Sequence, residues 1–127
     1  MIKNFLIISC TGKNNLLGLK IDNNFFIKRI QTNISNNDML VNNILDLISE
    51  NNVKVENSFS ILINIGPGSF SAIRVALAVA KGIKISIGTS LHGFKDSDLG
   101  EFNLINIDNL IKKNLLENEL IKPAYIS

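Results

Sequence analysis

Residues Ile65–Gly82 read IGPGSFSAIRVALAVAKG, and they continue from Phe59–Ile65, whose pattern is typical of a buried strand. Glycine permits positive φ, proline stiffens a turn, and the apolar residues beyond them continue at helical spacing to about Lys84. The stretch therefore predicts a strand, a tight turn and a helix. The turn and the start of the helix contain the residues Gly66, Pro67, Gly68, Ser69, Phe70 and Arg74.

The free N–H groups at the start of such a helix can hold an anion, so a phosphate seat is one interpretation of this turn. A P-loop also needs a Lys followed by Ser or Thr at the helix start, and the stretch has neither. The sequence therefore favours a structural corner over a phosphate site.

The predicted helix is apolar almost all the way round, because Arg74 is the one polar residue between Ser71 and Lys81. One sheet cannot cover the whole circumference of a helix, so we expect an outward apolar face that binds another protein. A row of alanines four residues apart would let a second helix approach closely, although it could instead pack on the sheet or on an earlier helix of the same chain. The predicted partner interface comprises Leu40, Ile44, Leu47, Ala72, Ile73, Ala76 and Ala80.

The remaining elements indicate an α/β fold. Phe5–Ser9, Leu16–Ile21 and Phe25–Ile30 are short runs separated by turn formers, which predicts an antiparallel meander. An amphipathic helix through residues 40–48 precedes the strand at 59–65. After the second helix the patterns are weaker. They predict a strand at 85–87, a helical turn or loop at 90–99, a strand at 102–107 and a helix at 108–117.

This order predicts a ribonuclease-H-like sheet, the core of the actin-like ATPase superfamily, as a single lobe with a mixed five-stranded sheet. With 127 residues, 46% hydrophobic and 19% charged, the chain is expected to form one domain, 1–127. A net charge of +2 is too small to indicate a nucleic-acid groove. We expect a cytoplasmic protein, because no secretory leader or membrane-length apolar run is found and Cys10 has no second cysteine to pair with.

The glycine-rich stretch closely resembles the signature of the TsaB (YeaZ) family of Gcp-like domains, Gly-Pro-Gly-Ser-Phe-Thr-Gly-Leu-Arg followed by a small-residue helix that ends in Ala-Lys-Gly. Phe5–Thr11 resembles the opening strand of that family, and Pro123–Ser127 resembles its closing Pro-x-Tyr-Leu-Arg. The sequence departs from the family at three places. Ser9 stands where an Asp is common, Ala72 replaces a Gly, and only a reduced remnant at about 91–127 fills the place of the second lobe.

The resemblance implies a non-catalytic subunit of the machinery that puts threonylcarbamoyl on a tRNA adenosine. It implies a heterodimer with a TsaD-type paralogue through a helical interface, a TsaE-type ATPase joining the complex, tRNA contact only through the complex, no membrane contact and no cofactor. Two alternatives stay open: a homodimer formed by the same helices, and a minimal nucleotide-binding enzyme of the actin-like superfamily. Ser9 is a poor magnesium ligand, which argues against the enzyme.

Other candidate residues give weaker signals. His92 has no second His or Cys to complete a metal site, and we expect it in a solvated loop. Asp96, Asp98 and Glu101 are typical of a polar loop. Cys10 lacks a basic neighbour in the sequence and is expected to be a small packed side chain rather than a nucleophile.

Overall fold

The computed structural model describes residues 2–12, 15–30, 37–118 and 125–126. Three residues of the closing motif, Pro123, Ala124 and Ser127, lie outside these ranges. Within the ranges, no helix is both long enough and apolar enough to span a bilayer.

The core is one mixed five-stranded sheet with the strand order β3-β2-β1-β4-β6. Strands β1 (Phe5–Ser9), β2 (Leu16–Ile21) and β3 (Asn24–Arg29) form the antiparallel meander that the sequence predicts. Strand β4 (Ser60–Asn64) pairs in parallel with β1, and β6 (Ser90–Phe94) pairs in parallel with β4. The predicted five-stranded mixed sheet is confirmed.

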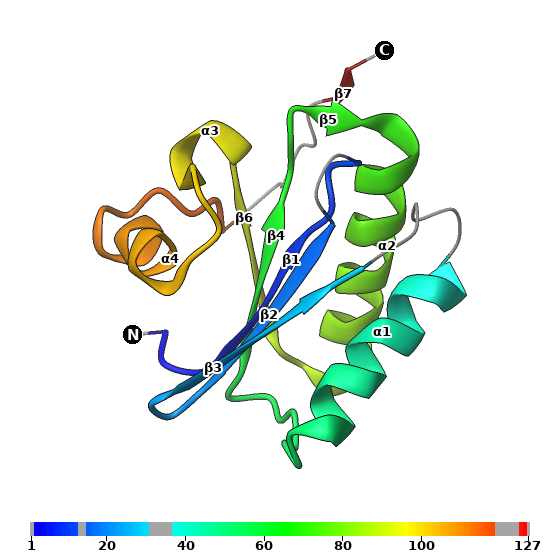
Figure 1. Cartoon of the computed structure of the whole chain (residues 1–127), viewed down its shortest axis with the longest axis vertical. Coiled ribbons are helices and arrows are strands. Elements are labelled where there is room, and N and C mark those ends of the chain that lie inside the picture. Colours follow the sequence, from blue (N-terminus) through cyan, green and yellow to red (C-terminus); the bar gives the residue numbers. More distant parts are fainter. Residues whose placement is uncertain (1, 13–14, 31–36, 119–124, 127) are drawn as a thin grey trace.

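Helices cover both faces of the sheet (Figure 1). On one face lie α1 (Asn37–Glu50) and α2 (Phe70–Ile87), while α3 (Asp96–Leu99) and α4 (Leu104–Lys112) lie on the other. Alternate residues of β1 enter different cores: Leu6 and Ile8 pack in the cluster with α1 and α2, and Phe5 and Ile7 in the cluster with α4. Burial on both faces explains why consecutive residues are apolar in the middle of β1 and β4.

Two short strands join the end of the chain to the glycine-rich turn. Strand β5 (Gly68–Ser69) pairs in parallel with β7 (Tyr125–Ile126), so the described part of the closing motif lies beside the signature turn. Two segments that resemble one family by sequence are therefore neighbours in space.

The strand predicted at 85–87 is wrong, because these residues form the last turn of α2. Gly88, at φ 81°, ends this helix, and its N–H donates to the carbonyl oxygen of Lys84 at 2.8 Å. The strand comes later, at β6, where a loop or helical turn was expected. Leu91 lies inside β6, so the segment assigned to a second-lobe remnant begins within the main sheet.

The strand predicted at 102–107 is also wrong. Helix α4 begins at Leu104, capped by Asn103, whose side chain accepts a hydrogen bond from the N–H of Asn106 at 2.8 Å. Short apolar runs fit a strand and a buried helix equally well, and here the cap and the packing of Ile107 and Leu110 decide for the helix.

We predict that Gly68→Ala lowers the free energy of unfolding, because an added Cβ would lie 2.7 Å from both the Cβ and the carbonyl oxygen of Thr11. Overpacking of this kind costs about 1–3 kcal/mol. Gly82→Ala is the matched control, since a Cβ there has no neighbour within 4 Å. It lies inside α2 and should gain about 0.5–1 kcal/mol. Urea unfolding followed by circular dichroism measures both, and equal stabilities would show that the turn is not closely packed.

Candidate functional site

Three parallel strands, β1, β4 and β6, end at the same edge of the sheet. In open α/β sheets this edge is where ligands usually bind. Ser9 is the last residue of β1, Asn64 is the last residue of β4, and Asp96 follows the end of β6 at the start of α3. The topology therefore gathers polar side chains that are far apart in the sequence.

Asn64 is fully buried and joins these strand ends through its side chain. Its amide nitrogen donates to the Ser9 Oγ at 3.1 Å and to the Asp96 Oδ1 at 2.9 Å, and its amide oxygen accepts from the N–H of Gly66 at 2.9 Å. Backbone bonds add to this link, because the N–H of Asp96 donates to the carbonyl oxygen of Gly66 at 2.9 Å. The result is a rigid polar floor at the edge of the sheet.

Sequence reasoning missed Asn64. The available signal was an amide in Phe59–Ile65, a stretch that is apolar apart from Ser60 and Asn64, because a buried polar group there needs partners. Its partners are 55 and 32 residues away along the chain, so their identity depends on the fold.

A cavity of about 400 Å³, which we call the strand-end cavity, opens beside this floor. Its charged groups are Arg29, at the end of β3, and the two carboxylates of Asp96 and Glu101. Asp96 and Glu101, which the sequence assigns to a polar loop, therefore lie at α3 and just after it and line a pocket that the sequence did not predict. The full lining is Ser9, Thr11, Leu16, Arg29, Asp96, Leu99, Gly100, Glu101 and Phe102.

Carboxylates are scarce where a metal would bind. Among the described residues, no three His, Cys, Asp or Glu side chains gather into a group that could hold a metal ion. Asp96 brings one carboxylate to the strand ends, beside the neutral Ser9 and Asn64. Hard cations prefer several oxygen ligands, including carboxylates, so this edge offers them little.

The signature turn acts as a tight corner between β4 and α2. Gly66 takes φ 100°, and the N–H of Ser69 donates to the carbonyl oxygen of Thr11 at 2.8 Å. Ser69 caps α2 by accepting from the N–H of Ala72 at 3.5 Å, and Pro67 follows Gly66 through a cis peptide bond. These contacts support the structural interpretation of the turn over the phosphate seat.

Two signature residues lie on the surface at the start of α2. Phe70 is about half exposed, and the guanidinium carbon of Arg74 lies 5.8 Å from the centroid of its ring. This distance fits a cation–π contact one helical turn apart.

The seven residues predicted to meet a partner are all buried inside this chain: Leu40, Ile44, Leu47, Ala72, Ile73, Ala76 and Ala80. Their placement on an outward face is therefore wrong. The inward sides of α1 and α2 carry five of them, Leu40, Ile44, Leu47, Ala76 and Ala80, into the same core as β1 and β4, and Ala72 and Ile73 are buried near the start of α2. A helix that is apolar all round does not reveal which side faces outward, and here the alanine row packs within the chain, the alternative that the sequence left open.

A different set of apolar side chains faces outward between α1 and α2. Val41, Leu45 and Ile87 are exposed, with Leu45 at 55%, and they line a groove with the side chains around them. We call this the α1/α2 groove. Its lining is wholly apolar: Leu6, Val41, Ile44, Leu45, Ile48, Val55, Val79, Ile83 and Ile87.

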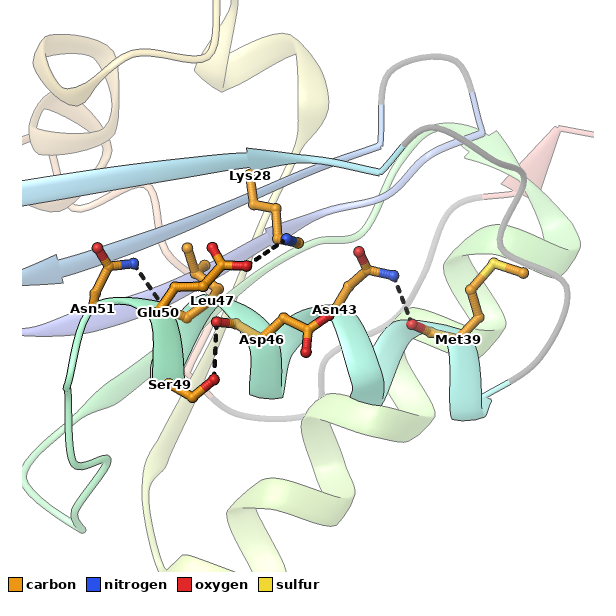
Figure 2. Close-up of polar contacts among 8 residues, drawn as sticks. All are labelled: Lys28, Met39, Asn43, Asp46, Leu47, Ser49, Glu50 and Asn51. Atoms are coloured by element: carbon orange, nitrogen blue, oxygen red, sulfur yellow. Dashed lines mark hydrogen bonds and ion pairs between the residues drawn. The ribbon is translucent and has the colours of Figure 1, made fainter.

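Polar groups of α1 find partners close by (Figure 2). Asn43 and Asn51 each donate a side-chain hydrogen bond to a carbonyl oxygen four residues earlier, at 2.8 Å. Glu50 pairs with Lys28 of β3 at 3.3 Å. These polar side chains of α1 therefore find their partners within the chain.

The two helices beside the groove carry opposite charge. Helix α1 contains Asp38, Asp46 and Glu50 and no Lys or Arg. Helix α2 contains Arg74, Lys81 and Lys84 and no Asp or Glu. The small net charge of the chain therefore conceals opposite charges on these two neighbouring helices.

His92 lies in β6 rather than in the expected loop. Its Nδ1 contacts the Asn118 Oδ1, and its Nε2 lies 3.2 Å from the Ser90 Oγ. Cys10 is buried, as the sequence predicted, and burial raises the pKa of its thiol to about 12. A thiol that stays protonated in this way is a poor nucleophile.

We predict that Asn64→Ala destabilises the fold, because it removes three hydrogen bonds and leaves buried partners without them. A buried group left unsatisfied costs about 1–3 kcal/mol. Asn43→Ala is the control, since it removes one bond on α1 and installs a better helix former. Thermal unfolding should separate the two variants by several degrees. Similar midpoints would mean that Asn64 does not hold the strand ends together.

No family model matches this chain, and no curated protein sequence matches it. Its structure is similar to that of YeaZ from Pseudomonas aeruginosa, with a TM-score of 0.70 and 15% identity, over 89% of this chain and 51% of that one. A second similar structure is an uncharacterised protein described as having similarity to peptidase YeaZ from Pseudomonas aeruginosa. There the TM-score is 0.67 and the identity 14%, over 89% of this chain and 50% of that one. The chain therefore has the ribonuclease-H-like, actin-like fold of YeaZ as a single lobe that spans about half the length of those structures.

Proposed function

We propose that this chain is a TsaB-type, non-catalytic subunit of the machinery that makes threonylcarbamoyladenosine in tRNA. The observation that carries the proposal is the YeaZ fold over 89% of the chain, with the TsaB-like signature at the corner between β4 and α2. Fold alone does not determine function, and the signature adds a specific sequence feature to it.

The proposed partner is a TsaD-type paralogue, bound through the α1/α2 groove as a heterodimer. An exposed, wholly apolar groove is typical of a protein-binding surface. The acidic α1 and basic α2 would orient a partner whose two helices carry the reverse pattern, since complementary charge sets register. The buried residues first assigned to the interface would support this surface from below.

An accessory role fits the chemistry of the strand ends. Ser9 and Asn64 are neutral, and Asp96 alone brings a carboxylate to their hydrogen-bonded network. In this proposal the paralogue holds nucleotide and metal, a TsaE-type ATPase joins the complex, and tRNA meets this chain only through the complex. Such a complex would work in the cytoplasm, where tRNA is modified.

We predict that Leu45→Glu leaves the fold intact and breaks the complex with the TsaD-type protein of the same organism. Leu45 is 55% exposed in the groove, so a carboxylate is hydrated in the free chain but buried in the complex. An unpaired buried charge costs about 3–5 kcal/mol, which weakens Kd by about a hundredfold or more. Circular dichroism checks the fold, and gel filtration with the paralogue checks assembly.

Ile105→Glu is the matched control, because Ile105 is 75% exposed on α4, across the sheet from the groove. It should co-elute with the paralogue as the parent chain does. Co-elution of folded Leu45→Glu would rule out the groove as the interface. The homodimer would be supported instead if the parent chain forms a stable dimer alone and does not bind the paralogue. Leu45→Glu should then abolish that dimer.

The second candidate, a minimal nucleotide-binding enzyme, is favoured by the position of the strand-end cavity, which Ser9 at the end of β1 and Asp96 at the start of α3 both line. Its charges oppose this use, since Asp96 and Glu101 would repel a triphosphate. We predict no saturable heat when Mg-ATP is titrated into the isolated chain at micromolar concentration. A saturable signal there would overturn the non-catalytic assignment.

A further inference from the structure

The strand-end cavity has walls of opposite charge. Arg29 lies on the side of β3, opposite Leu16 of β2 in the strand register. Asp96 and Glu101 come from the other side, at α3 and just after it. Ser9, the last residue of β1, and Thr11, two residues later, add hydroxyl-bearing side chains to the lining.

These charges do not neutralise each other. Among the described residues the one ion pair within 4.0 Å joins Lys28 to Glu50, so Arg29 pairs with neither Asp96 nor Glu101. The Asn64 amide fixes one oxygen of Asp96, and the other makes no hydrogen bond within the described chain. A ligand that carries both signs of charge would satisfy groups that the protein leaves separate.

We propose that the strand-end cavity binds a small zwitterion, namely a free α-amino acid with an apolar side chain. Its ammonium group would meet Asp96 and Glu101, and its carboxylate would accept two parallel hydrogen bonds from the Arg29 guanidinium. Leu99 and Phe102 line the same cavity and would contact the apolar side chain.

The size and rigidity of the cavity support this class of ligand. About 400 Å³ lies within the range of small-molecule sites and leaves room for an amino acid. The Asn64 hydrogen bonds hold Ser9 and Asp96 in place before any ligand arrives, which lowers the entropic cost of binding. A simple cation would leave Arg29 unpaired, and a simple anion would face both carboxylates.

The test is an amide NMR titration of the full chain with glycine, L-valine, L-leucine and L-phenylalanine at millimolar concentration. We expect an apolar amino acid to shift the amides of Thr11 and residues 96–102, and glycine to bind more weakly. L-leucinamide lacks the carboxylate and N-acetyl-L-leucine lacks the ammonium. Each should bind about tenfold more weakly than L-leucine, because each loses a charge-assisted interaction.

Two variants test which charged residue of the cavity binds which charged group of the ligand. Arg29→Gln should weaken the binding of L-leucine about tenfold and leave the affinity for L-leucinamide unchanged. Glu101→Gln should weaken the binding of L-leucine and of L-leucinamide and leave the affinity for N-acetyl-L-leucine unchanged. Arg74→Gln is the control, since it removes the same charge from the exposed surface of α2, outside the cavity lining. The proposal is overturned if none of the four amino acids shifts these amides, or if Arg29→Gln and Arg74→Gln have the same effect.

Discussion

The hydrogen bonds of one buried amide organise the edge of the sheet at which the parallel strands β1, β4 and β6 end. Asn64 ends β4, fixes Ser9 at the end of β1, and fixes Asp96 where β6 gives way to α3. Its oxygen also holds the N–H of Gly66, whose positive φ begins the corner into α2. The floor of the strand-end cavity and the starting point of α2 thus depend on the same side chain.

The first half of the fold could be read from sequence, because its signals are local and agree with one another. The meander has turn formers between apolar runs, and the corner before α2 has glycine, proline and a capping serine. Beyond Gly88 the runs are short, and apolar residues such as Ile105 are exposed at 75%, so the pattern no longer reports burial. There the order of elements was set by a helix cap and by packing on the second face of the sheet.

The candidate sites were harder to predict than the fold, for two different reasons. Asn64 acquires its role from partners that only the parallel pairing of β1, β4 and β6 brings close. The residues predicted for the partner interface are buried because α1 and α2 share one layer, so each covers part of the other and the alanine row turns inward. The exposed apolar side chains of α1, such as Val41 and Leu45, could not be distinguished in the sequence from the buried apolar residues of the same amphipathic helix.

In the proposed complex, charge separation would let a nearly neutral chain discriminate between partners. Helix α1 is wholly acidic in its charged residues and α2 is wholly basic, and the apolar groove runs between them. Apolar contact alone would favour any hydrophobic partner, whereas like charges placed opposite each other raise the cost of a wrong one. The groove would therefore supply the free energy of association, while the two helices would decide which partner, and which orientation, can use it.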